Sequence, residues 1–175
     1  MTLRHKGREL ALQLLYQWEL RGASPELIEE AFWPGAKAAA NTREFAHRLF
    51  TGAVGCCGQL DALIEAHATN WRLERMSAID RNILRLATFE LRFATAPANV
   101  VLDEAVELAK TFSDDGAPAF VNGVLDAIEK AGKQPAKSEA ERSKEKNAIA
   151  DSQGETPERR KPNNAGSKRG KKTRK

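Results

Sequence analysis

Four cationic or titratable side chains and an aromatic ring lie close together at the start of the chain. Arg4, His5, Lys6 and Arg8 fall in the first turns of a predicted helix, and Tyr16 follows on the same helix. Cations at a helix N-terminus oppose the helix dipole, and Arg4 and Arg8 are like charges four residues apart. Such groups bind phosphates, and a tyrosine ring stacks on a base. The pattern indicates a nucleic-acid contact; the alternative is a solvated charged end with Tyr16 packed under a loop.

These residues are positioned by a predicted helix over residues 3–20. Its apolar residues recur with helical spacing and form one continuous stripe, which consists of Leu3, Gly7, Leu10, Ala11, Leu14, Leu15 and Trp18. Leu12 and Tyr16 fall off this stripe, on the same side as His5, and are therefore predicted to be exposed. An exposed aliphatic residue beside an aromatic one suits either an RNA face or a dimer face.

The body of the chain is predicted to pack around a helix over residues 77–93. Its apolar residues cover roughly 220° of the helix circumference, whereas a surface helix needs a stripe of only about 100°. This helix must therefore be packed on several sides. Ser77 supplies an N-cap oxygen, and Asp80 three residues later resembles a capping box. Glu90 falls within the apolar arc, so we expect it to be neutralised by an arginine or a helix N-terminus.

The other periodic segments are also helical, and none alternates with the period of a strand. A short helix follows Ser24 and Pro25, a long one covers residues 41–64, and two more cover residues 99–112 and 118–132. Gly52, Gly55 and Gly58 share one side of the long helix and indicate either close helix packing or a break into two helices. We expect close packing with a bend. The body is predicted to be all-α.

Charge divides the chain at about residue 132. Residues 133–175 carry a net charge of +8, with 14 Lys and Arg against 6 Asp and Glu, whereas residues 1–132 carry −4. The tail lacks apolar residues that could build a core and is predicted to be disordered. Its end, residues 168–175, is suited to non-specific contact with RNA or another polyanion, although a plain solubilising tail is equally consistent. Any nucleic-acid site in residues 1–132 must come from local clustering of charge.

Patterns typical of catalysis are not found in the sequence. Cys56 and Cys57 are adjacent, which suits neither a disulfide framework nor a zinc site, and His5, His47 and His67 show no metal-ligand spacing. Phosphate-loop, dinucleotide-binding and nucleophile-elbow motifs are missing as well. We therefore expect no catalytic residues, no metal and no cofactor. Without a membrane-spanning run or a signal-peptide core, the chain is expected to be soluble and cytoplasmic.

Four segments, in order, resemble the NusB family of bacterial transcription antitermination factors. They are residues 4–16 (RHKGRELALQLLY), 79–91 (IDRNILRLATFEL), 101–110 (VLDEAVELAK) and 120–126 (FVNGVLD). The resemblance covers roughly residues 3–130. It implies a bundle of about seven helices, arranged as two small bundles that share a core. It also implies a non-enzymatic scaffold that binds boxA-type ribosomal RNA with the ribosomal protein NusE, in a complex with other Nus factors and RNA polymerase.

The resemblance also implies roles for individual residues. The RNA-binding positions would be Arg4, His5, Lys6, Arg8, Tyr16, Phe120 and Asn122. The positions that dock the ribosomal partner would be Glu74, Asp80 and Arg81. The arginines of the central helix, Arg85 and Arg92, are then expected to form structural ion pairs instead.

Two departures from the family pattern weaken the expected RNA site. His5 and Gly7 dilute the usual run of arginines, and Ala119 stands where a basic residue commonly precedes Phe120. We expect weaker RNA binding by residues 1–132, with the basic tail compensating. Two alternatives remain open: a protein-interaction module or homodimer with a buried RNA face, and the N-terminal module of an rRNA cytosine methyltransferase. The sequence does not choose between a monomer and a dimer.

Overall fold

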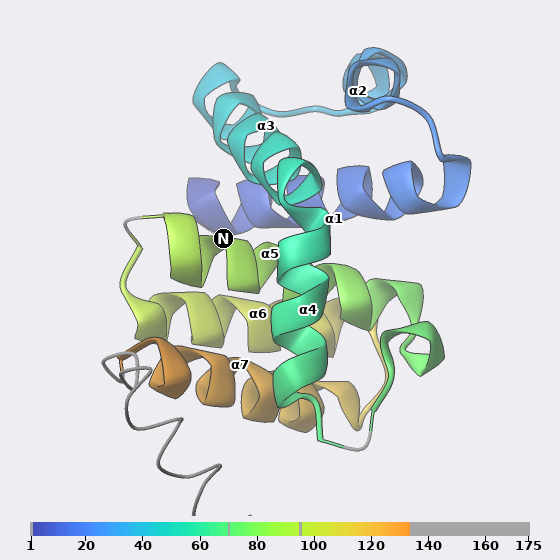
Figure 1. The fold of residues 1–175 in the computed structure, drawn as a ribbon. Helices are drawn as coiled ribbons and strands as arrows, with labels where there is room; N and C mark the ends of the chain where they lie inside the picture. Colours follow the sequence, from blue (N-terminus) through green and yellow to red (C-terminus); the bar gives the residue numbers. More distant parts are fainter. Residues whose placement is uncertain (1, 70, 95, 134–175) are drawn as a thin grey trace, which may run out of the picture. The chain divides into compact units, whose positions relative to one another are not determined.

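The computed structural model describes residues 2–69, 71–94 and 96–133. All regular structure within these ranges is helical, as predicted (Figure 1). The helices are α1 (Leu3–Arg21), α2 (Pro25–Phe32), α3 (Ala40–Gly55), α4 (Cys57–His67), α5 (Ala78–Phe93), α6 (Ala98–Phe112) and α7 (Ala117–Lys133), with short 3-10 turns η1 (Trp33–Gly35) and η2 (Leu73–Arg75). In these ranges no helix is long and apolar enough to cross a bilayer. The predicted tail lies outside the described residues from residue 134 onward.

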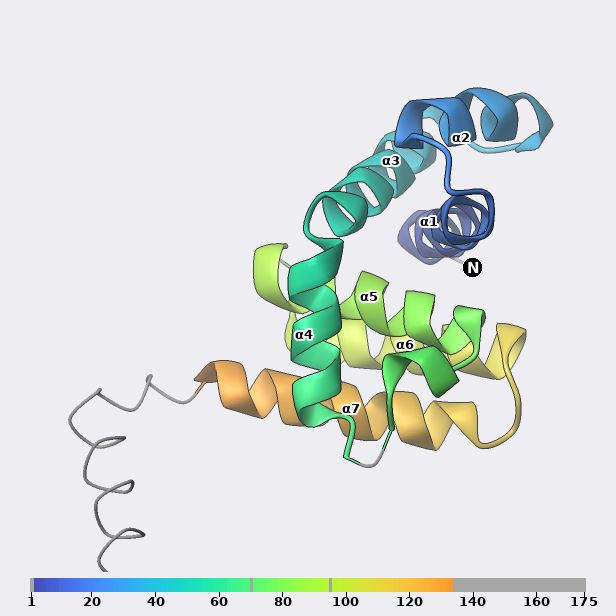
Figure 2. The same cartoon turned by 45° about the vertical axis from the view of Figure 1, so that its right-hand side comes forward.

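Helix α5 lies at the centre of the helical body. It contacts α1, α3, α4, α6 and α7, and Figures 1 and 2 show α5, α6 and α7 below α1 while α4 crosses beside them. Side chains on both sides of α5, including Ile83, Leu84 and Leu86, are almost fully buried. This confirms the prediction that the helix is packed on several sides.

The start of α5 shows which part of the predicted capping box forms. The hydroxyl of Ser77 accepts a hydrogen bond from the backbone N–H of Asp80 at 3.0 Å, as an N-cap should. The carboxylate of Asp80 does not turn back to Ser77; it accepts a hydrogen bond from the hydroxyl of Ser113 at 2.5 Å instead. Asp80 therefore ties the start of α5 to the end of α6.

The long helix predicted over residues 41–64 is two helices, and the expected bend is wrong. The chain breaks at Cys56, whose backbone leaves helical geometry with φ −119° and ψ 20°, so that α3 and α4 run in different directions (Figure 1). The expectation of close packing holds at one glycine only. An added Cβ on Gly52 would lie 2.2 Å from the ring of Phe89, whereas on Gly55 or Gly58 it would meet no described atom within 4 Å.

Replacing Gly52 with alanine should destabilise the fold by about 1–3 kcal/mol, because the methyl group must displace a packed ring. Gly58→Ala provides the matched control. There the methyl group meets open space within α4, and the higher helix propensity of alanine should stabilise by up to about 1 kcal/mol. Urea unfolding of both variants measures the difference. Equal effects at the two positions would contradict the close contact between α3 and α5.

Candidate functional site

The first turns of α1 carry two of the predicted RNA-binding cations on the surface. Arg4 is exposed, with its guanidinium carbon 5.1 Å from the centre of the Phe45 ring. Lys6 keeps 40% of its side chain exposed, although its ammonium group lies 2.8 Å from the Glu9 carboxylate. The hydroxyl of Thr2 caps the helix by accepting from the backbone N–H of His5 at 3.1 Å. Both cations are therefore accessible to an anion.

His5 is half-buried between two carboxylates. Its Nδ1 lies 2.8 Å from Glu104 on α6, and its Nε2 lies 3.5 Å from Glu9 one turn along α1. The ring thus joins α1 to α6. A contact between His5 and a phosphate requires the phosphate to approach next to these carboxylates, which makes His5 a weaker anion ligand than Arg4.

Arg8 is placed differently from the surface position expected for a phosphate ligand. Its side chain is 3% exposed, and its guanidinium donates two hydrogen bonds of 2.7 Å to the carboxylate of Glu90. The pair is bidentate, the strongest geometry available to these groups. Arg8 is therefore held in the core by this pair and is not presented at the surface as a phosphate ligand. The predicted pairing of Glu90 with an arginine is confirmed.

Tyr16 lies at the surface, as predicted, but Leu12 does not. Tyr16 is 36% exposed and Leu12 only 3%, because α1 is covered by α2, α3 and α5 on more sides than its stripe suggests. The two residues line a mainly apolar hollow of about 170 Å³ together with Gln13, Gln17, Ile79 and Phe112. A flat ring can enter such a hollow beside Tyr16. The burial of Leu12 removes one of the two residues that suggested a dimer face.

The other two predicted RNA residues lie at the start of α7. Asn122 is exposed, and Phe120 is half-buried with its ring centre 5.3 Å from that of Trp71. Trp71 is itself 51% exposed and is not among the predicted site residues. The feature of the sequence that indicates Trp71 as a candidate site residue is the presence of a large aromatic side chain in a short segment between helices. Since α7 packs chiefly on α4, α5 and α6, these residues form a group separate from the first turns of α1.

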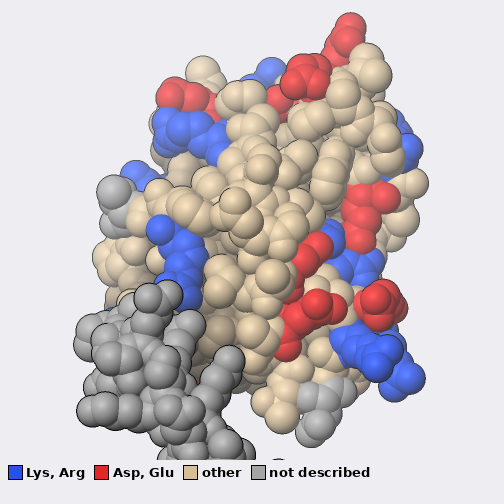
Figure 3. Space-filling view, viewed as in Figure 1, with Lys and Arg blue, Asp and Glu red and all other residues tan. Residues whose placement is uncertain are grey.

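Two of the three predicted partner-binding residues, Glu74 and Arg81, border an open, acidic hollow of about 550 Å³. It is lined by Glu19, Asp61, Glu65, Leu73, Glu74, Arg81 and Arg85. Figure 3, which shows the same face as Figure 1, has carboxylates and a few cations gathered toward the right-hand side, whereas much of the face carries no charge. With four carboxylates and two guanidinium groups, the hollow favours a partner that presents basic side chains.

Of the three predicted docking residues, only Glu74 is exposed, whereas Asp80 and Arg81 are half-buried. Arg81 donates to the carboxylate of Glu19 at 2.7 Å and to the backbone carbonyls of Leu73 and Met76 at 2.7 and 3.1 Å. This guanidinium holds η2 onto α5, so Arg81 shapes the wall of the hollow. Asp80 is half-buried and bonded to Ser113.

The expected structural ion pair is confirmed for Arg85 but is wrong for Arg92 among the described residues. Arg85 donates to Asp61 at 2.7 and 2.8 Å and lies 3.3 Å from Glu19. Burial acts to lower its pKa, but the hydrogen bonds to Asp61 and the nearby carboxylates outweigh that effect and raise it. Arg92 forms no ion pair within the described ranges; it donates to the backbone carbonyl of Ile128 at 3.3 Å. That contact lies near the end of α7, where a cation is favourable.

The remaining reactive side chains do not form a catalytic arrangement. Cys56 and Cys57 are half-buried free thiols. Burial raises the pKa of both, which keeps them in the protonated and less nucleophilic form. Among the residues that the structure describes, no group of three His, Cys, Asp or Glu side chains could hold a metal ion.

Comparison with known proteins identifies close relatives. The family model described as the NusB family matches residues 5–130. The transcription antitermination protein NusB of Myxococcus xanthus is 44% identical over 141 residues, which cover 77% of this chain and 100% of that protein. The solved structure of T. maritima NusB is 36% identical with a TM-score of 0.67, and the match covers 73% of this chain and 90% of that chain. A crystal structure of antitermination factors NusB and NusE in complex with dsRNA is also 36% identical, with a TM-score of 0.67, covering 75% of this chain and 98% of that chain.

Proposed function

The chain belongs to the NusB family, and from this we propose that it is a transcription antitermination factor. In this role it binds boxA-type ribosomal RNA together with the ribosomal protein NusE, within a complex of other Nus factors and RNA polymerase. The observation that carries the proposal is the match of nearly the whole helical body, in sequence and in fold, to antitermination proteins of this name. The role is one of binding and not of catalysis, in the cytoplasm where transcription takes place.

The RNA surface follows from the exposed side chains of α1 and α7. Arg4 and Lys6 supply positive charge for phosphates, and Tyr16 borders a hollow that accepts a flat ring. Phe120 and Asn122 extend the surface at the start of α7, with Trp71 beside them. Two groups on separate helices suit an extended single strand, because stacking and phosphate contacts then alternate along it.

The partner surface is the acidic hollow beside η2. Glu74 is its exposed carboxylate, while Arg81 and Asp80 act indirectly by fixing η2 and the start of α5. A ribosomal protein carries many lysines and arginines for its own RNA, and such a protein is complementary to this hollow. The RNA and partner surfaces therefore use different residues, so one can be altered without the other.

Replacing Tyr16 with alanine should weaken binding of boxA-type RNA by about tenfold, because one base loses its stacking partner. Tyr16→Phe keeps the ring and should bind nearly as the original does. Lys6→Ala removes one phosphate contact and should flatten the dependence of log K on log salt by about 0.7. Fluorescence anisotropy on the complex with NusE measures both effects. Unchanged affinity and salt dependence in Tyr16→Ala and Lys6→Ala would show that α1 does not contact the RNA.

A further inference from the structure

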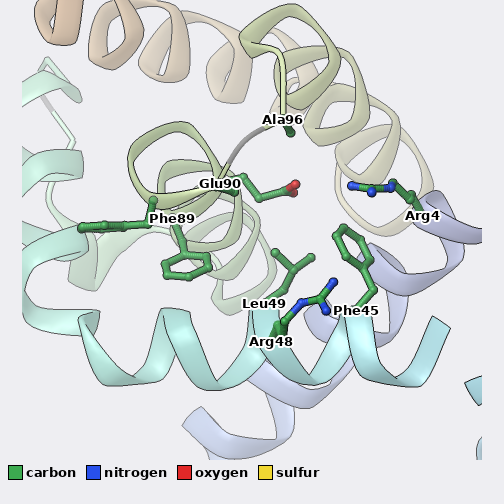
Figure 4. A pocket seen from close by; sticks show the side chains of 9 residues that line it. Arg4, Phe45, Arg48, Leu49, Phe89, Glu90 and Ala96 are labelled. Carbon is green, nitrogen blue, oxygen red and sulfur yellow. The ribbon is translucent and has the colours of Figure 1, made fainter. Parts of the chain in front are cut away.

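A groove on the other side of the first turn of α1 has no role in the function proposed so far. It lies between that turn, α3 and the end of α5, and has a volume of about 350 Å³. Figure 4 shows Arg4 reaching into it from α1 and Arg48 from α3, with Phe45 between them and Phe89 and Glu90 on the α5 side. An adjoining hollow of about 270 Å³ shares Arg4, Phe45 and Arg48 with it. The two hollows therefore adjoin at these three residues.

The rim of this groove carries available positive charge. Arg4 is exposed and has no ion pair with any carboxylate in the described part of the chain. Arg48 lies 2.8 Å from Glu44, but both side chains are more than half exposed, at 59% and 68%, so the pair is weak and can exchange for a phosphate. The carboxylate of Glu90 at the floor is already neutralised by Arg8. Two guanidinium groups at the rim are therefore available to bind an anion.

The walls of the groove carry aromatic rings. Phe93, in the last turn of α5, is 57% exposed, so its ring is accessible from the groove. Its ring centre lies 5.6 Å from that of Phe89, with an angle of 33° between the planes. On the opposite wall, Phe45 lies under the guanidinium of Arg4. A flat ring that enters the groove can therefore lie against Phe93 while an attached anion reaches Arg4 or Arg48.

We propose that this groove binds one or two unpaired nucleotides of the RNA strand that α1 holds. The proposal rests on the proposed function, because Arg4 belongs to both surfaces and leads the strand from α1 onto α3. A nucleotide meets both requirements of the site: its base stacks on an exposed phenylalanine and its phosphate binds a guanidinium. The volume admits a base and its sugar, and the neutralised floor does not repel the phosphate. The two exposed residues that the groove adds to the RNA surface are Arg48 and Phe93.

The direct test uses Phe93→Trp in the full chain. The new ring retains stacking, and its fluorescence, taken as the difference from the original protein, should be quenched by a short oligouridylate. Adding Arg48→Ala to this variant should weaken the quenching titration about fivefold and lower its salt slope by about 0.7. Lys37→Ala, which removes an exposed cation outside the groove, should leave the titration unchanged. Absence of quenching, or equal titrations with and without Arg48, would overturn the proposal.

A second test separates this proposal from the function on which it rests. The complex with NusE is titrated with a boxA-type RNA and with the same RNA extended by three unpaired uridines at either end. One of the two extensions should raise the affinity for the RNA about tenfold. Phe93→Ala should abolish that gain without changing binding of the core RNA. Leu20→Ala, which shortens another exposed apolar side chain, should keep the gain. Core binding without any gain, or a gain that survives Phe93→Ala, contradicts the groove alone. Failure of the core RNA to bind contradicts the proposed function, and the oligouridylate titration then still decides the groove.

Discussion

Replacing Glu90 with glutamine is expected to lower the free energy of unfolding by about 3–5 kcal/mol. The two side chains are 3% and 2% exposed and share two hydrogen bonds of 2.7 Å. Loss of the carboxylate charge leaves the buried guanidinium of Arg8 with only the Glu104 carboxylate, at 3.6 Å, as a counter-ion, and most of the desolvation of that charge is then uncompensated. A domain of this size has only about 5–15 kcal/mol of stability in total. Arg8→Ala should be destabilising to a similar degree, since it strands Glu90.

Urea unfolding followed by circular dichroism measures this effect, and two further variants test its cause. Lys6→Ala removes a partly exposed partner of Glu9, whose side chain is 40% exposed, and should change stability by less than about 1 kcal/mol. The double replacement of Arg8 and Glu90 by methionine removes both charges and should recover much of the loss, because no buried charge is left alone. A loss below about 1 kcal/mol in Glu90→Gln would contradict a buried, desolvated pair.

This prediction changes how RNA binding by Arg8 variants is to be understood. A loss of RNA binding in Arg8→Ala would follow from partial unfolding of α1 against α5, even if Arg8 never contacts RNA. Arg4 and Lys6, which are accessible, are the informative positions for phosphate contacts. Four cationic or titratable residues that look alike in sequence thus divide into a buried structural arginine, a histidine between carboxylates and two surface cations.

The sequence predicts the elements of the fold well, because helical periodicity and caps are local. The central helix begins after Ser77 and ends at Phe93 as expected, and the isolated carboxylate in its apolar arc had to be neutralised. The identity of its partner was not accessible, since Arg8 is 82 residues away in the chain. Position on a helical wheel likewise assigned Leu12 to the surface, because the wheel does not show how many neighbours surround α1. The burial of Leu12 is decided by the packing of α2, α3 and α5 on α1.

The break between α3 and α4 could not be predicted from the sequence, and neither could the RNA-binding and partner surfaces. The reason is the same for all of them, because each depends on contacts between segments that are distant in the chain. Three glycines with equal spacing look equivalent in sequence, but only Gly52 meets a ring from another helix. The acidic hollow is assembled from α1, α4, η2 and α5, so no single segment carries its signal. Arg81 was selected as a docking residue for its place in a motif, whereas its hydrogen bonds to Glu19 and to two backbone carbonyls emerge only in three dimensions.

Glu19→Ala is expected to lower the free energy of unfolding by about 2–4 kcal/mol, because three donors converge on this carboxylate. It accepts from Arg81 at 2.7 Å and from Asn82 at 2.6 Å, and it lies 3.3 Å from Arg85. Asn82 is fully buried, so the loss of a partner there costs more than at the surface. Arg81 retains its bonds to the carbonyls of η2, which limits the effect. Urea unfolding measures it, and a change below about 0.5 kcal/mol would mean that the donors find other partners.

Glu74→Lys is the matched variant in the same hollow. It should leave the free energy of unfolding nearly unchanged and weaken partner binding. Its carboxylate is exposed, so stability should change by less than about 0.5 kcal/mol. Reversal of its charge should slow association with NusE, and this effect should weaken as salt is added. Glu19→Ala should weaken NusE binding as well, but together with stability, because Arg81, which holds η2 to α5, loses the carboxylate that fixes its guanidinium. Surface plasmon resonance on both variants distinguishes the two roles. If Glu74→Lys binds NusE with an unchanged association rate at low salt, the acidic hollow is not the docking surface.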